Sequence, residues 1–213
     1  NDNRPYGYTQ YVVDKNLYPQ DHPYSWQVIG SLKDLQSATL QDVKDFYHKW
    51  YVPNNVTLVV SGDFDEKQAT AWIHQYFDEI KPGKEINKQE KPQITLAKTK
   101  KIYHEDNFAR LPELTLTWPT IEQYHQDSYA LDILTQLLTE GKKAPLNKKL
   151  IDDLKLTSKI DMYHYQSELA GQMMLSVRAF EKTDLDHVAK ALKKAFRDFE
   201  SDGFSQDDLA RIK

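Results

Sequence analysis

The sequence of 213 residues contains no cysteine. Disulfide bonds, thiolate nucleophiles, and zinc or iron–sulfur sites with cysteine ligands are therefore excluded. The lack of thiols does not select a compartment, because a cysteine-free chain is suited to reducing and oxidising environments alike.

Long apolar runs and an excess of basic residues are also missing. No run approaches the roughly 20 apolar residues that a membrane span needs, so we expect neither a membrane span nor a signal peptide within these residues. The 28 Lys and Arg residues against 32 Asp and Glu give a net charge of −4, which argues against a nucleic-acid partner. A first residue other than Met, and a helical pattern that stops at Lys213, indicate a segment of a longer protein.

Aromatic residues are plentiful, and the 4 Trp, 13 Tyr and 8 Phe can fill a sizeable core. Residues 1–38 are expected to be irregular, apart from a short helix that could start between Ser31 and Asp34. Helical periodicity then predicts a helix from Leu40 that Thr39 caps, with Asp42 as its capping-box partner. A second helix is expected over residues 66–80 after the cap Asp65, and the β-branched run Val56–Ser61 between them predicts a buried strand.

The only convincing boundary inside the chain is a polar, proline-bounded linker at residues 81–93. Strands and helices follow it, with Tyr129 and Leu138 expected on the inward side of the first helix. The expected strands are Thr99–Asp106, Leu111–Trp118, Ile160–Tyr165 and Gln172–Phe180, and the expected helices cover residues 125–138, 145–154 and 184–200. This pattern predicts an α+β fold in which helices cover one face of an antiparallel sheet.

The seven histidines do not form a metal motif, since no two lie closer than 21 residues. A zinc-hydrolase site of the HxxEH or HExxH type needs two histidines about one helical turn apart. His164 and Glu168 are four apart, but on a strand running into a turn, so a structural or solvated His164 is favoured over a ligand. His74 is expected at the surface, and His22, in an aromatic turn, is also interpreted as structural. We therefore assign no catalytic and no metal-ligating residue to this chain.

A series of short stretches across residues 22–77 occurs in a specific order and spacing. They are His22-Pro23-Tyr24, Ile29-Gly30, Asp34-Leu35, Asp42-Val43, Phe46-Tyr47, Tyr51 to Asn55, Leu58 to Asp65 and Tyr76-Phe77. This series resembles the pitrilysin/insulinase family of zinc metallopeptidases. A looser likeness continues through Leu137 to Leu150 and Gly203 to Lys213, although residues 140–145 (EGKKAP) replace the usual glycine–serine turn of that family.

The resemblance implies that zinc belongs to the parent protein and not to this chain. In the family, an HxxEH helix and a later glutamate bind zinc, and the motif glutamate is the general base for the attacking water. The third-ligand glutamate precedes a segment similar to Asn3-Arg4-Pro5-Tyr6-Gly7, so no metal-ligand position carries over. Arg4, Tyr6 and His22 become the candidates for residues near the mouth of the active site.

The resemblance also implies an organisation and a set of partners. Residues 1–38 would be the tail of a zinc-bearing unit, and residues 39–213 a metal-free second unit that is expected to be inactive alone. The parent would be a zinc-dependent metalloendopeptidase, periplasmic or secreted, in which this segment is scaffold and substrate-chamber wall. Its partners would be a peptide substrate and the other half or subunit of the peptidase. The alternative is a non-catalytic family homologue that acts as a structural or binding partner of an active peptidase subunit.

Overall fold

The computed structural model describes residues 3–87 and 89–212. The chain divides into two compact units. Unit 1 comprises Asn1–Gln27 and Glu90–Lys213, and unit 2 comprises Val28–Gln89. The second crossing between the units falls inside the linker at residues 81–93, whereas the assignment of residues 1–38 and 39–213 to zinc-bearing and metal-free units stays a prediction.

Unit 1 is built on a three-stranded antiparallel sheet in the order β1-β3-β2. The strands are β1 (Glu113–Thr120), β2 (Thr157–Gln166) and β3 (Gly171–Ala179). In the sheet, Leu175 of β3 lies between Leu116 of β1 and Met162 of β2. Three of the four strands that were expected beyond the linker are thereby confirmed.

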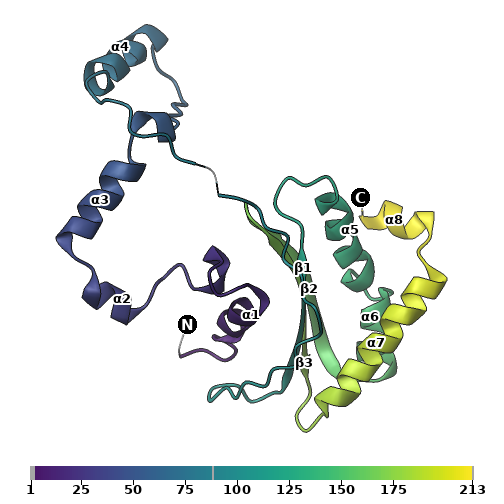
Figure 1. Ribbon diagram of the computed structural model, residues 1–213. Helices are drawn as coiled ribbons and strands as arrows, with labels where there is room; N and C mark the ends of the chain where they lie inside the picture. Colours follow the sequence, from purple (N-terminus) through teal and green to yellow (C-terminus); the bar gives the residue numbers. More distant parts are fainter. Residues whose placement is uncertain (1–2, 88, 213) are drawn as a thin grey trace. The chain divides into compact units, whose positions relative to one another are not determined.

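Helices cover one face of this sheet, as the sequence predicts (Figure 1). They are α5 (Ser128–Thr139), α6 (Pro145–Asn147), the π-helical segment η3 (Lys148–Asp153) and α7 (Leu185–Asp202), followed by α8 (Gln206–Ile212). The core between helices and sheet includes Leu138, Leu146, Leu150, Ile160, Leu175, Val177, Val188 and Leu192. The α+β class is therefore confirmed.

Helix α7 shows how the sequence produces this layer. The Asp184 side chain accepts a hydrogen bond from the N–H of Asp186 at 2.9 Å, which satisfies one of the free donors of the first turn. Val188, Leu192 and Ala195 are buried at spacings of four and three, so they form one apolar stripe against the sheet. The helix ends where Gly203 adopts a φ of +69°.

The opposite face of the sheet carries a helix that the sequence does not predict. Helix α1 (Thr9–Leu17) lies on the other side of the sheet from α5 and α7 (Figure 1), so the expectation of an irregular N-terminal region is wrong there. Leu17 and Tyr18 pack with Ile94 and Ala170 in a second cluster. Leu17 is the only buried residue of α1, so the apolar pattern of this helix is too weak to predict it from the sequence.

Unit 2 consists of short helices. They are α2 (Leu32–Ser37), α3 (Leu40–Trp50), the 3-10 turn η2 (Pro53–Asn55) and α4 (Glu66–Phe77). The expected caps are confirmed: the Thr39 side chain accepts from the N–H of Asp42, and Asp42 accepts from the N–H of Thr39 in return. The Asp65 side chain likewise accepts a hydrogen bond from the N–H of Gln68.

Two expected strands do not form. Residues 56–61 have no strand pairing, and Val59 is 80% exposed; Thr99–Asp106 is also outside the sheet, with Tyr103 80% exposed. A β-branched run becomes a strand only where a neighbouring backbone pairs with it, and in the described residues neither run has that neighbour. Tyr129 was also expected inside, but it is 72% exposed. Nine residues at about 100° each place it half a turn from the buried Leu138.

The central position of Leu175 gives a test of this core. Leu175→Ala removes a fully buried side chain where β3 meets the helices, and leaves a cavity. We expect the free energy of unfolding to fall by about 2–5 kcal/mol in urea denaturation followed by circular dichroism. Tyr129→Ala is the control and should change it by less than about 0.5 kcal/mol, because that side chain is exposed. Equal effects of the two variants would contradict this packing.

Candidate functional site

Tyr6 lies in the first turn of unit 1 and is fixed by three contacts. Its φ is +61°, in the left-handed region that residues with side chains rarely adopt. Its N–H donates to Oδ2 of Asp106 at 2.7 Å, and its hydroxyl donates to the carbonyl oxygen of Leu111 at 2.9 Å. The guanidinium of Arg178 on β3 lies 3.8 Å from the ring centroid, in cation–π geometry. These contacts fasten the turn to the sheet.

The Asp106 carboxylate accepts hydrogen bonds from several backbone N–H groups around this turn. It accepts from the N–H of Phe108 at 2.7 Å and of Ala109 at 2.9 Å, in addition to Tyr6. These bonds, led by the one from Phe108, hold the pKa of Asp106 below its usual range because they favour the ionised form. Arg4 precedes Tyr6 in the same turn; it is exposed, and its carbonyl oxygen accepts from the N–H of Gly7 at 3.0 Å.

His22 is buried in an aromatic clamp at the end of α1. It is 5% exposed and stacks on Tyr18 with ring centroids 4.9 Å apart, while Tyr24 meets it edge-on at 5.0 Å. Its Nδ1 accepts from the N–H of Tyr24 at 3.1 Å, which caps the 3-10 turn η1 (Pro23–Ser25). The Tyr24 hydroxyl in turn accepts from the N–H of Leu169 at 3.1 Å. The structural interpretation of His22 is thus supported by its packing.

The electrostatics of this clamp follow from burial. Because Nδ1 is an acceptor, the neutral ring carries its proton on Nε2, which is buried and has no hydrogen-bond partner among the described residues. Burial lowers the pKa of His22 against a smaller opposing effect of Asp21. Burial, followed by the negative charge of Asp14, raises the pKa of Tyr18. Both shifts favour the uncharged forms of these two rings.

The structure fixes Tyr6 and His22 through different neighbours. Tyr6 contacts Asp106, Leu111 and Arg178, whereas His22 contacts Tyr18 and Tyr24. Neither ring nitrogen of His22 bonds to a carboxylate or a hydroxyl in the described part of the chain. These contacts hold the rings of Tyr6 and His22 in fixed positions, and they do not pair a nucleophile with a general base.

The arrangement that most resembles a catalytic set lies elsewhere, at His164 on β2. Its Nδ1 lies 3.0 Å from Oδ1 of Asp132 on α5, and its Nε2 lies 2.9 Å from Oγ1 of Thr120. The imidazole is wholly buried, and Thr120 Oγ1 would lie only 2.6 Å from a Cβ placed on Gly171. Both ring nitrogens are thus engaged within the fold, and the set joins β1, β2 and α5. The structural interpretation of His164 therefore holds, with Asp132 and not Glu168 as its carboxylate partner.

His164 shares the inward side of β2 with Ile160 and Met162, and this alternation is the sequence signal that places it inside. Its partners Asp132 and Thr120 are 32 and 44 residues away in the sequence, so no local motif predicts these contacts. His74 is at the surface, as expected, and pairs with Asp78 at 3.0 Å.

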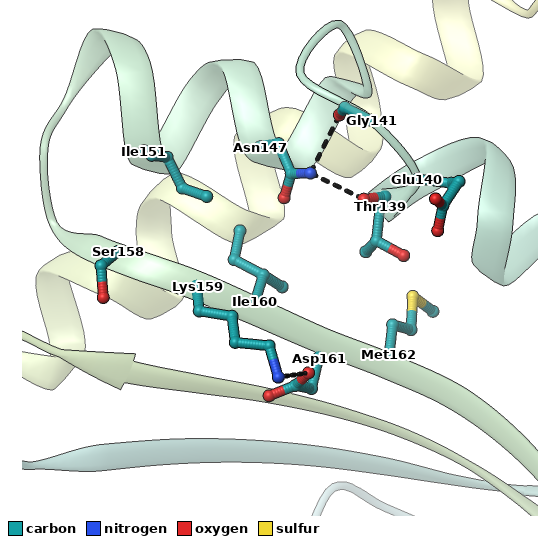
Figure 2. A pocket seen from close by; sticks show the side chains of 10 residues that line it. All are labelled: Thr139, Glu140, Gly141, Asn147, Ile151, Ser158, Lys159, Ile160, Asp161 and Met162. Carbon is teal, nitrogen blue, oxygen red and sulfur yellow. Dashed lines mark hydrogen bonds and ion pairs between the residues drawn. The ribbon is translucent and has the colours of Figure 1, made fainter.

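An open hollow of about 420 Å³ lies between β2 and the end of α5. Figure 2 shows the side chains that line it. The Asn147 side chain donates to the carbonyl oxygens of Thr139 at 2.6 Å and Gly141 at 3.0 Å. Lys159 and Asp161 form an ion pair of 2.6 Å along the strand. Arg211 adds a bond to the carbonyl oxygen of Glu140 at 2.9 Å. The bonds from Asn147 and Arg211 satisfy free carbonyls at and just beyond the C-terminus of α5, which is a structural task.

Within residues 3–87 and 89–212, no group of three or more histidine and carboxylate side chains is placed to hold a metal ion. In the same residues, no helix combines the length and the apolar character of a membrane crossing.

A comparison with protein families matches residues 37–213 to the one described as "Peptidase M16 inactive domain". The match covers most of the chain. The chain belongs to this family. Its likeness to the pitrilysin group of peptidases, suggested by the stretches between His22 and Phe77, is thereby confirmed.

Relatives of this M16 inactive domain include the zinc protease PqqE of Helicobacter pylori, which is 26% identical over all of this chain and 48% of its own length. The structure of a peptidase M16 inactive domain from Pseudomonas fluorescens is 21% identical, with a TM-score of 0.73 over 99% of this chain and 50% of its own. The periplasmic protease PqqL of Escherichia coli is 21% identical, with a TM-score of 0.70 over 96% of this chain and 23% of its own. The chain thus spans about half or less of these proteins.

The buried imidazole of His22 predicts a pH dependence of stability in the M16 domain. The unfolded chain binds the proton with an ordinary pKa of about 6.5, and the folded chain binds it less readily. Stability is therefore full above that value, and is lost as pH falls through the lowered pKa of the folded state. Between pH 7.5 and 5.5, the free energy of unfolding should fall more in the wild type than in His22→Phe, measured by urea denaturation. Equal falls would show that His22 does not titrate this way.

Proposed function

We propose that this chain is the non-catalytic segment of a zinc-dependent metalloendopeptidase, in which it serves as scaffold and as a wall of the substrate chamber. The observation that carries the proposal is the match of residues 37–213 to the inactive domain of the M16 peptidases. The relative from Helicobacter pylori, which aligns with the whole chain, is described as a zinc protease. The sequence itself contains no HxxEH motif, so the chemistry is assigned to the rest of the parent protein.

In this proposal, zinc is held by the parent outside these residues, and peptides are its substrates. The other half of the peptidase is the partner of this chain, which is consistent with relatives that are about twice as long. A periplasmic or secreted location is supported by the description of PqqL from Escherichia coli as a periplasmic protease.

Arg4, Tyr6 and His22 are proposed to lie near the mouth of the active site. Support comes from the exposure of Arg4 and from the rigid anchoring of the turn that carries it, through Tyr6 and Asp106. His22 would contribute indirectly, by supporting the turn η1, since its ring is buried and does not reach solvent.

Activity and metal content test the proposal together. The full-length parent should contain about one zinc ion and cleave a fluorogenic peptide. A chelator should abolish this cleavage, because the zinc ion activates the water that attacks the peptide bond. This chain alone should show neither activity nor stoichiometric zinc. Chelator-sensitive cleavage by the chain alone would overturn its non-catalytic role. A parent without zinc and without activity would instead favour the alternative, a non-catalytic homologue that binds an active peptidase subunit.

A further inference from the structure

The two carboxylate oxygens of Asp106 have different tasks. Oδ1 accepts from the N–H groups of Phe108 at 2.7 Å and of Ala109 at 2.9 Å, which follow Asp106 by two and three residues. Aspartate side chains commonly form such local turns with the backbone that follows them. Oδ2 accepts instead from the N–H of Tyr6 at 2.7 Å, across 100 residues of sequence. The local turn does not require this distant bond, so the bond serves the segment that carries Tyr6.

The backbone of Tyr6 adopts a conformation that surrounding contacts must stabilise. Its φ of +61° is unfavourable for a residue with a Cβ atom, and such a conformation persists where neighbouring groups fix it. The ring of Tyr6 is held by the carbonyl oxygen of Leu111 and by the guanidinium of Arg178. Arg178 is fixed in turn by Glu113, with Nη2 and Oε2 3.0 Å apart. These contacts fix the ring, whereas Asp106 bonds the backbone and so sets the direction of the turn.

The turn that Asp106 holds also carries Arg4. The carbonyl oxygen of Arg4 accepts from the N–H of Gly7 at 3.0 Å, which closes the turn around Tyr6. The carbonyl oxygen of Tyr6 accepts from the N–H of Thr9, the first residue of α1, at 3.2 Å. Tyr6 therefore joins Arg4 on one side to α1 on the other. A change in the backbone angles of Tyr6 would redirect Arg4 relative to the sheet on which α1 lies.

We infer that Asp106 is a positioning residue of the parent peptidase, whose Oδ2 fixes the backbone of Tyr6 and thereby places Arg4 for contact with the peptide substrate. The inference rests on the proposed function, in which Arg4 lies near the mouth of the active site. A guanidinium donates hydrogen bonds in a fixed planar geometry, so its contribution to binding depends on the direction in which it is held. Asp106 acts through Arg4, and the segment before β1 thus takes a specific part in substrate binding.

Asp106→Asn separates the two tasks of this side chain. The amide oxygen of asparagine can keep the bonds from Phe108 and Ala109, but its NH2 group then faces the N–H of Tyr6 and cannot accept from it. In the full-length parent, the Tyr6 amide should exchange hydrogen at least about tenfold faster in the variant, with the Phe108 and Ala109 amides changed by less than about threefold. The amide of Leu175 on β3 reports that unit 1 remains folded.

Peptide cleavage by the same parent variant tests the effect on the substrate. KM for a fluorogenic peptide should rise about tenfold and kcat should change by less than about twofold, because a contact made equally in the ground and transition states affects KM alone. The zinc content should not change. In an Arg4→Ala background, Asp106→Asn should raise KM no further, since Asp106 acts through Arg4. Such non-additivity distinguishes positioning from a general loss of stability.

Asp184→Asn is the matched control in unit 1. It removes the same charge from a side chain that bonds locally to the N–H of Asp186 at the start of α7. Asparagine caps a helix about as well as aspartate, so both kinetic constants should stay within about twofold of the wild type.

Four other outcomes overturn the inference. A Tyr6 amide that stays protected in Asp106→Asn means that Oδ2 does not hold the turn. A released Tyr6 amide with unchanged KM means that the turn does not serve the substrate, and the proposed function still stands. Equal rises in KM with and without Arg4 assign the effect to a general change in unit 1. A parent with neither zinc nor activity overturns the proposed function itself, and with it the reaction in which Asp106 would take part.

Discussion

The packing of β3 against α7 is the contact on which unit 1 depends. β3 is the middle strand, so every hydrogen bond between strands of the sheet involves it. Leu175 and Val177 are fully buried on the side that faces Val188 and Leu192 of the helix. Because packed interiors tolerate little displacement, this layer fixes β1 and β2 on either side. The polar side of β3 then positions the first turn, through Arg178 and the ring of Tyr6.

Much of this architecture could be predicted because its signals are local. β1 alternates Leu114, Leu116 and Trp118 with polar residues, and the structure turns that side to the helices, where Trp118 meets Phe196 of α7 edge-on. The capping box of Thr39 and Asp42 depends on three residues of separation and was equally visible. Such elements carry their own periodicity and their own end signals.

The rest depends on contacts between distant residues. Tyr6 and Asp106 are 100 residues apart in the sequence, and His164 and Asp132 are 32 residues apart. Helix α1 is stabilised by the cluster of Leu17 and Tyr18 and not by a strong stripe of its own. The run at 56–61 shows the reverse case: its composition favours a strand, but strand formation needs a partner backbone that composition cannot supply. The candidate residues Arg4, Tyr6 and His22 came from likeness to a family, and geometry adds that two of them are held tightly in place.

The edge strand β2 and the run at 56–61 differ in how they meet other polypeptides. On β2, which is an edge strand, Lys159 and Asp161 are exposed and charged, and charges on an edge discourage a foreign strand from adding there. The run at 56–61 has no such protection, with three consecutive apolar residues in water and no charge between Val56 and Ser61. An isolated chain is therefore more prone to aggregate through this run than through the edge strand β2. During synthesis, exposed apolar surface of this kind makes a chain prone to associate with other chains before it is covered.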